Sequence, residues 1–164
     1  MIAWGHSAVG ASVGVITYSI YGADKPVEGL IAAGFAGTIS HYVCDFIPHG
    51  HIVKYLTRSN TPLILFLDLF LGVAFFFGLD FYYHGITLRT LYILLGIGGT
   101  QLPDIVSGLS AREIIKRTGF LKMEYNFHQA LHWHGTGKNA LLLSLNDVWQ
   151  LVIVVIAAYL LIRT

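Results

Sequence analysis

Histidine and aspartate side chains carry the chemistry that this sequence could perform. His41 and Asp45 are four residues apart, so on a helix they share one face. His128 and His132 have the same spacing. Imidazole and carboxylate groups together suit zinc, and also iron or manganese. The sequence therefore predicts a site for a divalent transition metal, with zinc as the first choice.

Further candidate ligands exceed what a single ion needs. His6 and Asp104 are expected to lie at the same depth as His41 and Asp45. Three protein ligands are enough for one catalytic zinc ion, so one ion is expected, or two bridged by a carboxylate. A simpler interpretation exists for each residue alone, because a single intramembrane histidine commonly serves as a hydrogen-bonded packing residue.

Other polar residues are predicted to support such a site. His49 or His134 would move protons, because imidazole titrates near neutral pH. Asp68 and Asp147 would orient the ligand imidazoles through hydrogen bonds. Two cations near the site could hold an anionic headgroup, namely Lys138 and Arg112.

Composition indicates a membrane protein. Charged residues make up 12% of the 164 residues, about half the usual share in soluble domains, and mean hydropathy is +0.65. Apolar stretches of roughly 20 residues recur, long enough to cross a ~30 Å hydrocarbon core. We expect one all-α, polytopic domain over residues 1–164 with five transmembrane helices. These cover about residues 2–22, 28–47, 62–79, 88–107 and 140–162.

The connections between these helices are predicted to be polar. Residues 80–89 are expected to form a loop with interfacial aromatic side chains. The segment 108–138 is expected to lie at the membrane surface, with a plain basic connector between two spans as the alternative. Within it, Ser110 begins a capping-box pattern that predicts a short basic helix closed by Gly119. Small residues are expected to let helices approach closely at Gly10, Gly14, Gly34 and Gly37.

Charge asymmetry predicts the orientation. Seven lysine and arginine residues fall on the face that holds the N-terminus, and three fall on the other. The N-terminus is therefore expected in the cytoplasm and the C-terminus outside, with no removable signal peptide. Seven of the eight histidines share the cytoplasmic face. A net charge of +1 argues against nucleic acid as a partner and leaves membrane lipids.

Three short motifs resemble a known family. The stretch Gly37–Pro48, Gly-Thr-Ile-Ser-His-Tyr-Val-Cys-Asp-Phe-Ile-Pro, is similar to the Ser-His-x-x-x-Asp motif of bacterial membrane-bound metal-dependent hydrolases. Gly5-His6 resembles that family's early Gly-His, and Leu102–Ile105 resembles its Leu-Pro-Asp-Ile element. The resemblance implies an inner-membrane hydrolase.

The order of these motifs differs from the family pattern. The Pro-Asp element follows the Ser-His element here, and the family's His-Arg-Gly-x-Thr-His-Ser segment is absent. We expect residues 127–134 to replace that segment. A fainter similarity connects the His-x-x-x-Asp spacing to all-helical zinc phospholipases C and S1-type nucleases, which hydrolyse phosphoesters.

These patterns favour a metal-dependent hydrolase that acts on a phospholipid or other lipid phosphate at the cytoplasmic face. A metal or proton transporter would use the same residues but needs polar groups at mid-membrane, which the sequence largely lacks. A non-catalytic scaffold with a structural metal is the other alternative. A diiron oxygenase is disfavoured because the paired His-x-x-His-His boxes are missing.

Overall fold

Every regular element that the structure describes is an α-helix, so the all-α class is confirmed. The computed structural model describes residues 3–46, 61–111, 115–116, 118–131 and 140–164. Within them lie six helices, α1 (Ala3–Tyr21), α2 (Pro26–Phe46), α3 (Thr61–His84), α4 (Leu88–Ala111), α5 (Gly119–Leu131) and α6 (Ala140–Arg163).

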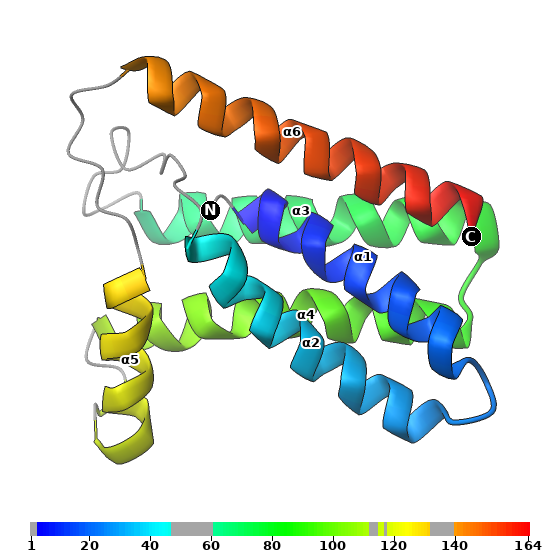
Figure 1. The fold of residues 1–164 in the computed structure, drawn as a ribbon, viewed down its shortest axis with the longest axis horizontal. Coiled ribbons are helices and arrows are strands. Elements are labelled where there is room, and N and C mark those ends of the chain that lie inside the picture. The colour runs from blue at the N-terminus through cyan, green and yellow to red at the C-terminus, as the bar shows by residue number, and fades with distance from the viewer. Residues whose placement is uncertain (1–2, 47–60, 112–114, 117, 132–139) are drawn as a thin grey trace.

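The long helices run roughly lengthwise and α5 stands across one end of them (Figure 1). α1 and α2 pack chiefly against α4, and α3 and α6 pack against α1. Chain direction alternates, so the start of α1, the end of α2 and the end of α4 lie at the end that α5 covers (Figure 1). We call this the α5 end of the bundle.

Glycines allow α1, α2 and α4 to lie in close contact. A Cβ atom on Gly96 would overlap the carbonyl oxygen of Gly10, and one on Gly37 would overlap that of Gly96. Gly14 lies equally close to the α4 backbone. A Cβ on Gly34 would meet nothing, but the carbonyl oxygen of Gly34 would be overlapped by a Cβ on Gly99 of α4. The helices therefore approach closely at all four predicted glycines, although at Gly34 it is Gly99 that must lack a side chain.

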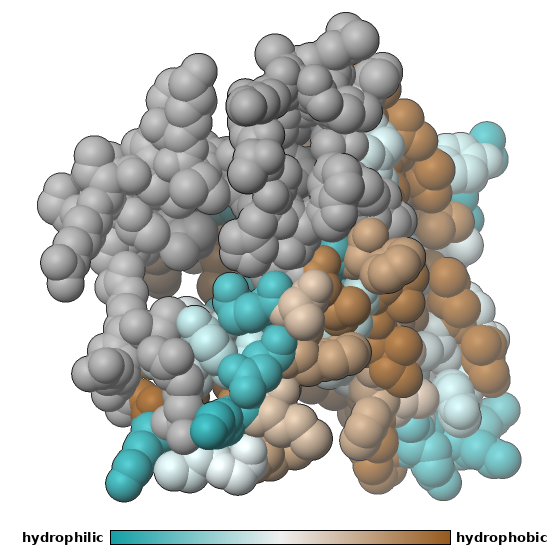
Figure 2. All heavy atoms as spheres, turned by 60° about the vertical axis from the view of Figure 1, so that its left-hand side comes forward, coloured by the Kyte–Doolittle hydropathy of each residue, from teal (hydrophilic) through white to brown (hydrophobic). Residues whose placement is uncertain are grey.

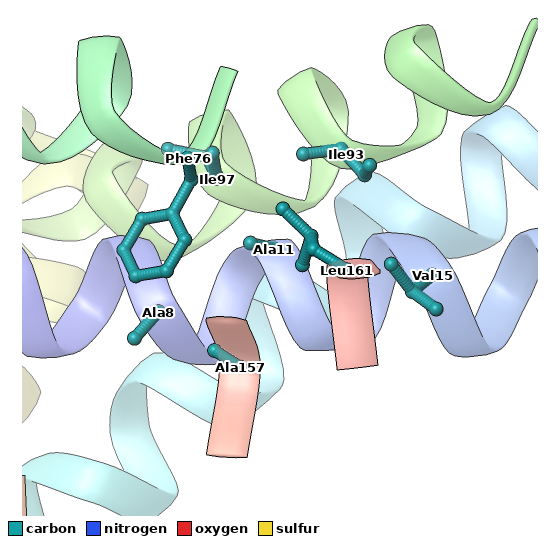
Figure 3. Packing of buried hydrophobic residues seen from close by; sticks show 8 residues of the cluster. All are labelled: Ala8, Ala11, Val15, Phe76, Ile93, Ile97, Ala157 and Leu161. Atoms are coloured by element: carbon teal, nitrogen blue, oxygen red, sulfur yellow. The ribbon is translucent and has the colours of Figure 1, made fainter. Parts of the chain in front are cut away.

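A small apolar core lies beside these contacts. Figure 3 shows side chains from α1, α3, α4 and α6 that converge on one another. The cluster consists of Ala8, Ala11, Val15, Phe76, Ile93, Ile97, Ala157 and Leu161. Three of the eight side chains in this cluster are alanines, so the helices around it approach closely. Many of the larger apolar side chains lie on the outer surface of the bundle.

The outer surface is rich in large apolar side chains. On α2 these side chains repeat every four residues at Val27, Ile31, Phe35, Ile39 and Val43, each more than half exposed. α3 and α6 carry similar exposed rows. Figure 2 shows a broad brown, hydrophobic area on one face, with teal hydrophilic residues in separate patches.

One helix among the described residues is long and apolar enough to cross a membrane, over Phe66–His84. A shorter apolar stretch covers Val148–Arg163. The predicted five spans are therefore not supported by this measure. α1, α2 and α4 contain many Gly, Ser and Thr residues, and α1 and α2 each contain one His. Several of these residues are buried between helices, and they lower the mean hydropathy.

Two predicted connections were wrong. The loop expected at residues 80–89 is mostly helical, since α3 continues to His84 and α4 begins at Leu88. The short helix expected from Ser110 to Gly119 falls partly outside the described residues, but both of its predicted ends were wrong. Ser110 belongs to the last turn of α4, and Gly119 begins α5 with a φ of 51° instead of ending a helix.

Buried polar contacts explain why α3 extends further than predicted. Asp80 is fully buried, pairs with Arg89 at 3.1 Å and accepts a hydrogen bond from Thr90 at 2.8 Å. Arg89 and His84 both contact the carbonyl oxygen of Leu161, at 2.8 and 2.9 Å. These contacts join α3, α4 and the end of α6 at the end of the bundle opposite α5.

Candidate metal centre

Four helices bring five predicted ligands together at the α5 end. His6 lies near the start of α1, and His41 and Asp45 lie in the last turns of α2. Asp104 comes from α4 and His128 from α5. The i, i+4 spacing places the His41 and Asp45 side chains 3.1 Å apart. Residues up to 122 positions apart in the chain thus meet in one cluster.

The spacing of four of these side chains fits a bound ion. Nε2 of His41 lies 3.3 Å from Nε2 of His128, and both lie 3.1 Å from Oδ2 of Asp45. Oδ1 of Asp104 is 3.4 Å from Nε2 of His128 and 4.0 Å from Nε2 of His41. Ligands at ~2.1 Å in a tetrahedron are about 3.4 Å apart. His41, Asp45, Asp104 and His128 can therefore hold a metal ion.

A backbone carbonyl sets the orientation of His41. Its Nδ1 lies 2.6 Å from the carbonyl oxygen of Thr100. Because a carbonyl oxygen only accepts hydrogen bonds, Nδ1 of the neutral ring carries the proton. Nε2 then presents its lone pair to the cluster, as a metal ligand must.

A proline in α4 helps to place Asp104. Pro103 lies inside the helix and has no N–H, so the carbonyl of Gly99 loses its partner from the next turn. The hydroxyl of Thr38 on α2 donates to that carbonyl at 3.2 Å. The Pro-Asp element thus remains helical and is joined to α2, the helix that carries His41 and Asp45.

His6 is enclosed by the other ligands. Its ring is fully buried and stacks on His41 with centroids 4.2 Å apart. Nε2 lies 3.3 Å from Oδ1 of Asp45 and 3.8 Å from Oδ2 of Asp104. Within the described part of the chain Nδ1 has no hydrogen-bond partner, and Nε2 faces these two carboxylates. A buried imidazole in this state favours a further ligand at Nε2.

A second carboxylate lies behind His128. Nδ1 of His128 faces Oε1 of Glu124 at 3.7 Å, and the hydroxyl of Tyr42 donates to the same oxygen at 3.2 Å. Burial alone would lower the pKa of His128, but hydrogen bonds to Asp104 and Asp45 raise it to about 9. In the ion-free site His128 therefore holds a proton at neutral pH, and a metal must displace it.

One carboxylate of the cluster is partly exposed. The side chains of His6, His41 and Asp45 are fully buried and that of His128 is 1% exposed, whereas Asp104 is 36% exposed. Asp104 is therefore the one ligand of the five with substantial exposed area. A catalytic ion needs contact with water or substrate, whereas a structural ion is fully enclosed by protein.

The other predicted site residues lie elsewhere in the chain. Those outside the described residues are His49, His132, His134, Lys138 and Arg112. Asp147 belongs to α6, but its side chain is also outside the described set. Asp68 is half-buried on α3. The roles predicted for all seven stay predictions.

Several supporting residues were missed by the sequence reasoning. Glu124 is four residues before His128, and that helical spacing could have identified it. Tyr42 is adjacent to His41 in sequence but carried no signal of its own. The carbonyl of Thr100 could not be found from sequence, because any residue type provides a carbonyl.

Comparison with protein-family models, with curated proteins and with solved structures finds no match for this chain.

Proposed function

We propose that this chain is a membrane-embedded, metal-dependent hydrolase of phospholipids or other lipid phosphates, with zinc as its metal. The observation that carries the proposal is the buried cluster of three imidazoles and two carboxylates. Without an ion, two carboxylates would share a site in which only Asp104 has substantial exposed area. An ion neutralises both and occupies the lone pairs that converge there.

The exterior of the bundle supports a membrane location. Exposed apolar rows on α2, α3 and α6 exceed what a soluble monomer normally presents to water. Between helices, polar side chains bond to neighbouring backbones, as the hydroxyl of Thr100 does to the carbonyl of His6 at 2.9 Å. Interhelical bonds of this kind and close glycine contacts are typical of helices packed in a bilayer.

In five spans the α5 end would lie at the cytoplasmic surface of a bacterial inner membrane. α5 would then occupy the headgroup layer, with Phe120, Met123 and Phe127 exposed toward lipid and Lys122 exposed nearby. A site at this depth meets lipid phosphates by lateral diffusion, and this proximity favours a lipid substrate.

The residues present suit phosphoester hydrolysis. A bound divalent ion lowers the pKa of water to about 7 and supplies positive charge beside phosphate oxygens. Asp45 would hold the ion from the closed side of the cluster. Asp104, on the open side, would hold it next to the entering substrate. Glu124 would keep the His128 ring oriented through Nδ1.

A scaffold with a structural metal is the second candidate. The nearly complete burial of the three histidines favours it, because structural sites enclose their ion. Transport is less well supported. Between His6 and the far end of α1 the bundle interior holds the alanine-rich core cluster. That cluster offers few polar groups to line a pathway for a metal ion or proton.

The test compares wild-type protein with Asp45→Asn in lipid nanodiscs. Elemental analysis measures bound metal, and release of phosphorylated headgroup or phosphate from a panel of phospholipids measures turnover. We expect bound zinc in the wild type. The Asp45→Asn variant should lose its metal, and its turnover should fall by more than about 100-fold. Asp24→Asn is the matched control, because Asp24 is exposed in the turn between α1 and α2.

The outcomes separate the candidates. Metal with turnover in the wild type supports the hydrolase. Metal without hydrolysis of any tested phosphoester supports the scaffold. Protein that neither retains nor takes up zinc, manganese or iron would refute both.

A further inference from the structure

The two aspartates of the cluster divide their oxygens between two groups of histidines. Oδ2 of Asp45 faces His41 and His128, both at 3.1 Å, while its Oδ1 faces His6 at 3.3 Å. Asp104 repeats the pattern. Its Oδ1 lies 3.4 Å from His128 and its Oδ2 lies 3.8 Å from His6. Each carboxylate thus presents one oxygen to each histidine group.

His6 lies outside the first group of ligands. The group whose ligand atoms lie within 4.8 Å of one another consists of His41, Asp45, Asp104 and His128, enough for one ion. His6 is fully buried, and its Nε2 points at the remaining carboxylate oxygens. A buried imidazole aimed at two carboxylate oxygens is itself half of a metal site.

We infer that the centre binds two metal ions, bridged by the carboxylates of Asp45 and Asp104. The first ion takes His41, His128 and one oxygen from each aspartate. The second takes Nε2 of His6 and the other two oxygens. This inference deepens the proposed function and rests on the metal site at its centre.

The second ion has fewer protein ligands within the described residues. The imidazole of His6 and two oxygens give it three, which leaves positions for water and for a substrate. Ions bridged in this way lie about 3.5–4 Å apart and together hold the attacking and leaving oxygens of a phosphoester. The ligand class for the second ion is therefore a phosphate monoester or diester oxygen.

The test counts ions per chain. Wild-type protein and His6→Gln, both in nanodiscs, are loaded with zinc, passed over a desalting column and analysed for metal and protein. We expect two ions per chain in the wild type and one in His6→Gln. His84→Gln is the matched control, because His84 lies at the opposite end of the bundle on the Leu161 carbonyl. It should keep two ions.

A second measurement needs no variant. Wild-type protein loaded with Mn²⁺ should give the EPR spectrum of a spin-coupled ion pair, because carboxylate bridges couple neighbouring ions. One zinc per wild-type chain, or an uncoupled Mn²⁺ spectrum at saturation, would overturn the two-ion centre and leave the one-ion hydrolase intact. No bound metal at all would instead refute the proposed function.

Discussion

Gly96 and Gly98 lie two residues apart on α4 and have opposite surroundings. A Cβ on Gly96 would overlap the carbonyl oxygen of Gly10 on α1 and would lie 3.0 Å from the backbone nitrogen of Gly14. A Cβ on Gly98 would meet nothing within 4 Å. Substituting each with alanine therefore compares a blocked position with an open one on the same helix.

The expected cost follows from this geometry. For Gly96→Ala, α1 and α4 must separate by on the order of 1 Å, and overpacking of this kind costs about 1–3 kcal/mol. Both substitutions gain similar helix propensity, roughly 1 kcal/mol, so the difference between them isolates the contact. We expect Gly96→Ala to be less stable than Gly98→Ala by about 1–3 kcal/mol.

The same displacement should weaken metal binding. His6 lies on α1 one turn before Gly10, whereas Asp104 is fixed to α4, so separating the helices moves these ligands apart. Denaturation in detergent micelles gives the stability difference, and zinc competition with a chromophoric chelator gives the affinity. Equal stability and equal affinity in the two variants would refute the packing described for α1 and α4.

Three further predictions follow from other contacts. Thr38→Val should lower the free energy of unfolding by about 0.5–1.5 kcal/mol in wild type. In a Pro103→Ala background it should cost close to nothing, because the restored N–H then satisfies the Gly99 carbonyl. A double-mutant cycle by denaturation measures the difference. Zinc affinity should rise by up to about tenfold per pH unit from pH 6 to 8. The reason is that the pKa of His128 is raised to about 9, so this side chain must lose a proton when the metal binds. An affinity independent of pH would contradict this. Asp80→Asn should destabilise the bundle by about 3–5 kcal/mol, because it leaves the buried charge of Arg89 uncompensated. Its metal content should not change. Thermal unfolding measures the stability, and elemental analysis measures the metal.

Local patterns in the sequence determined the helices and half of the site. Composition and long apolar stretches predicted an all-α chain. Three of the five expected long helices match α1, α2 and α6 within two residues at both ends, whereas α3 and α4 extend five and four residues further than expected. The four-residue spacing of His41 and Asp45 placed both on one face, because helical geometry depends only on neighbours in the chain. Alternating chain direction then predicted that His6 and Asp104 would lie at the same end.

Tertiary packing decided what depends on contacts between distant segments. The extension of α3 past Asp80 follows from Arg89 and Thr90, which satisfy a carboxylate that a sequence pattern assigns to a loop. The division of the Asp45 and Asp104 oxygens between two histidine groups likewise depends on side-chain rotamers. It also depends on the distances between α1, α2 and α4, which glycines allow to be short, and no spacing along one chain segment encodes those distances.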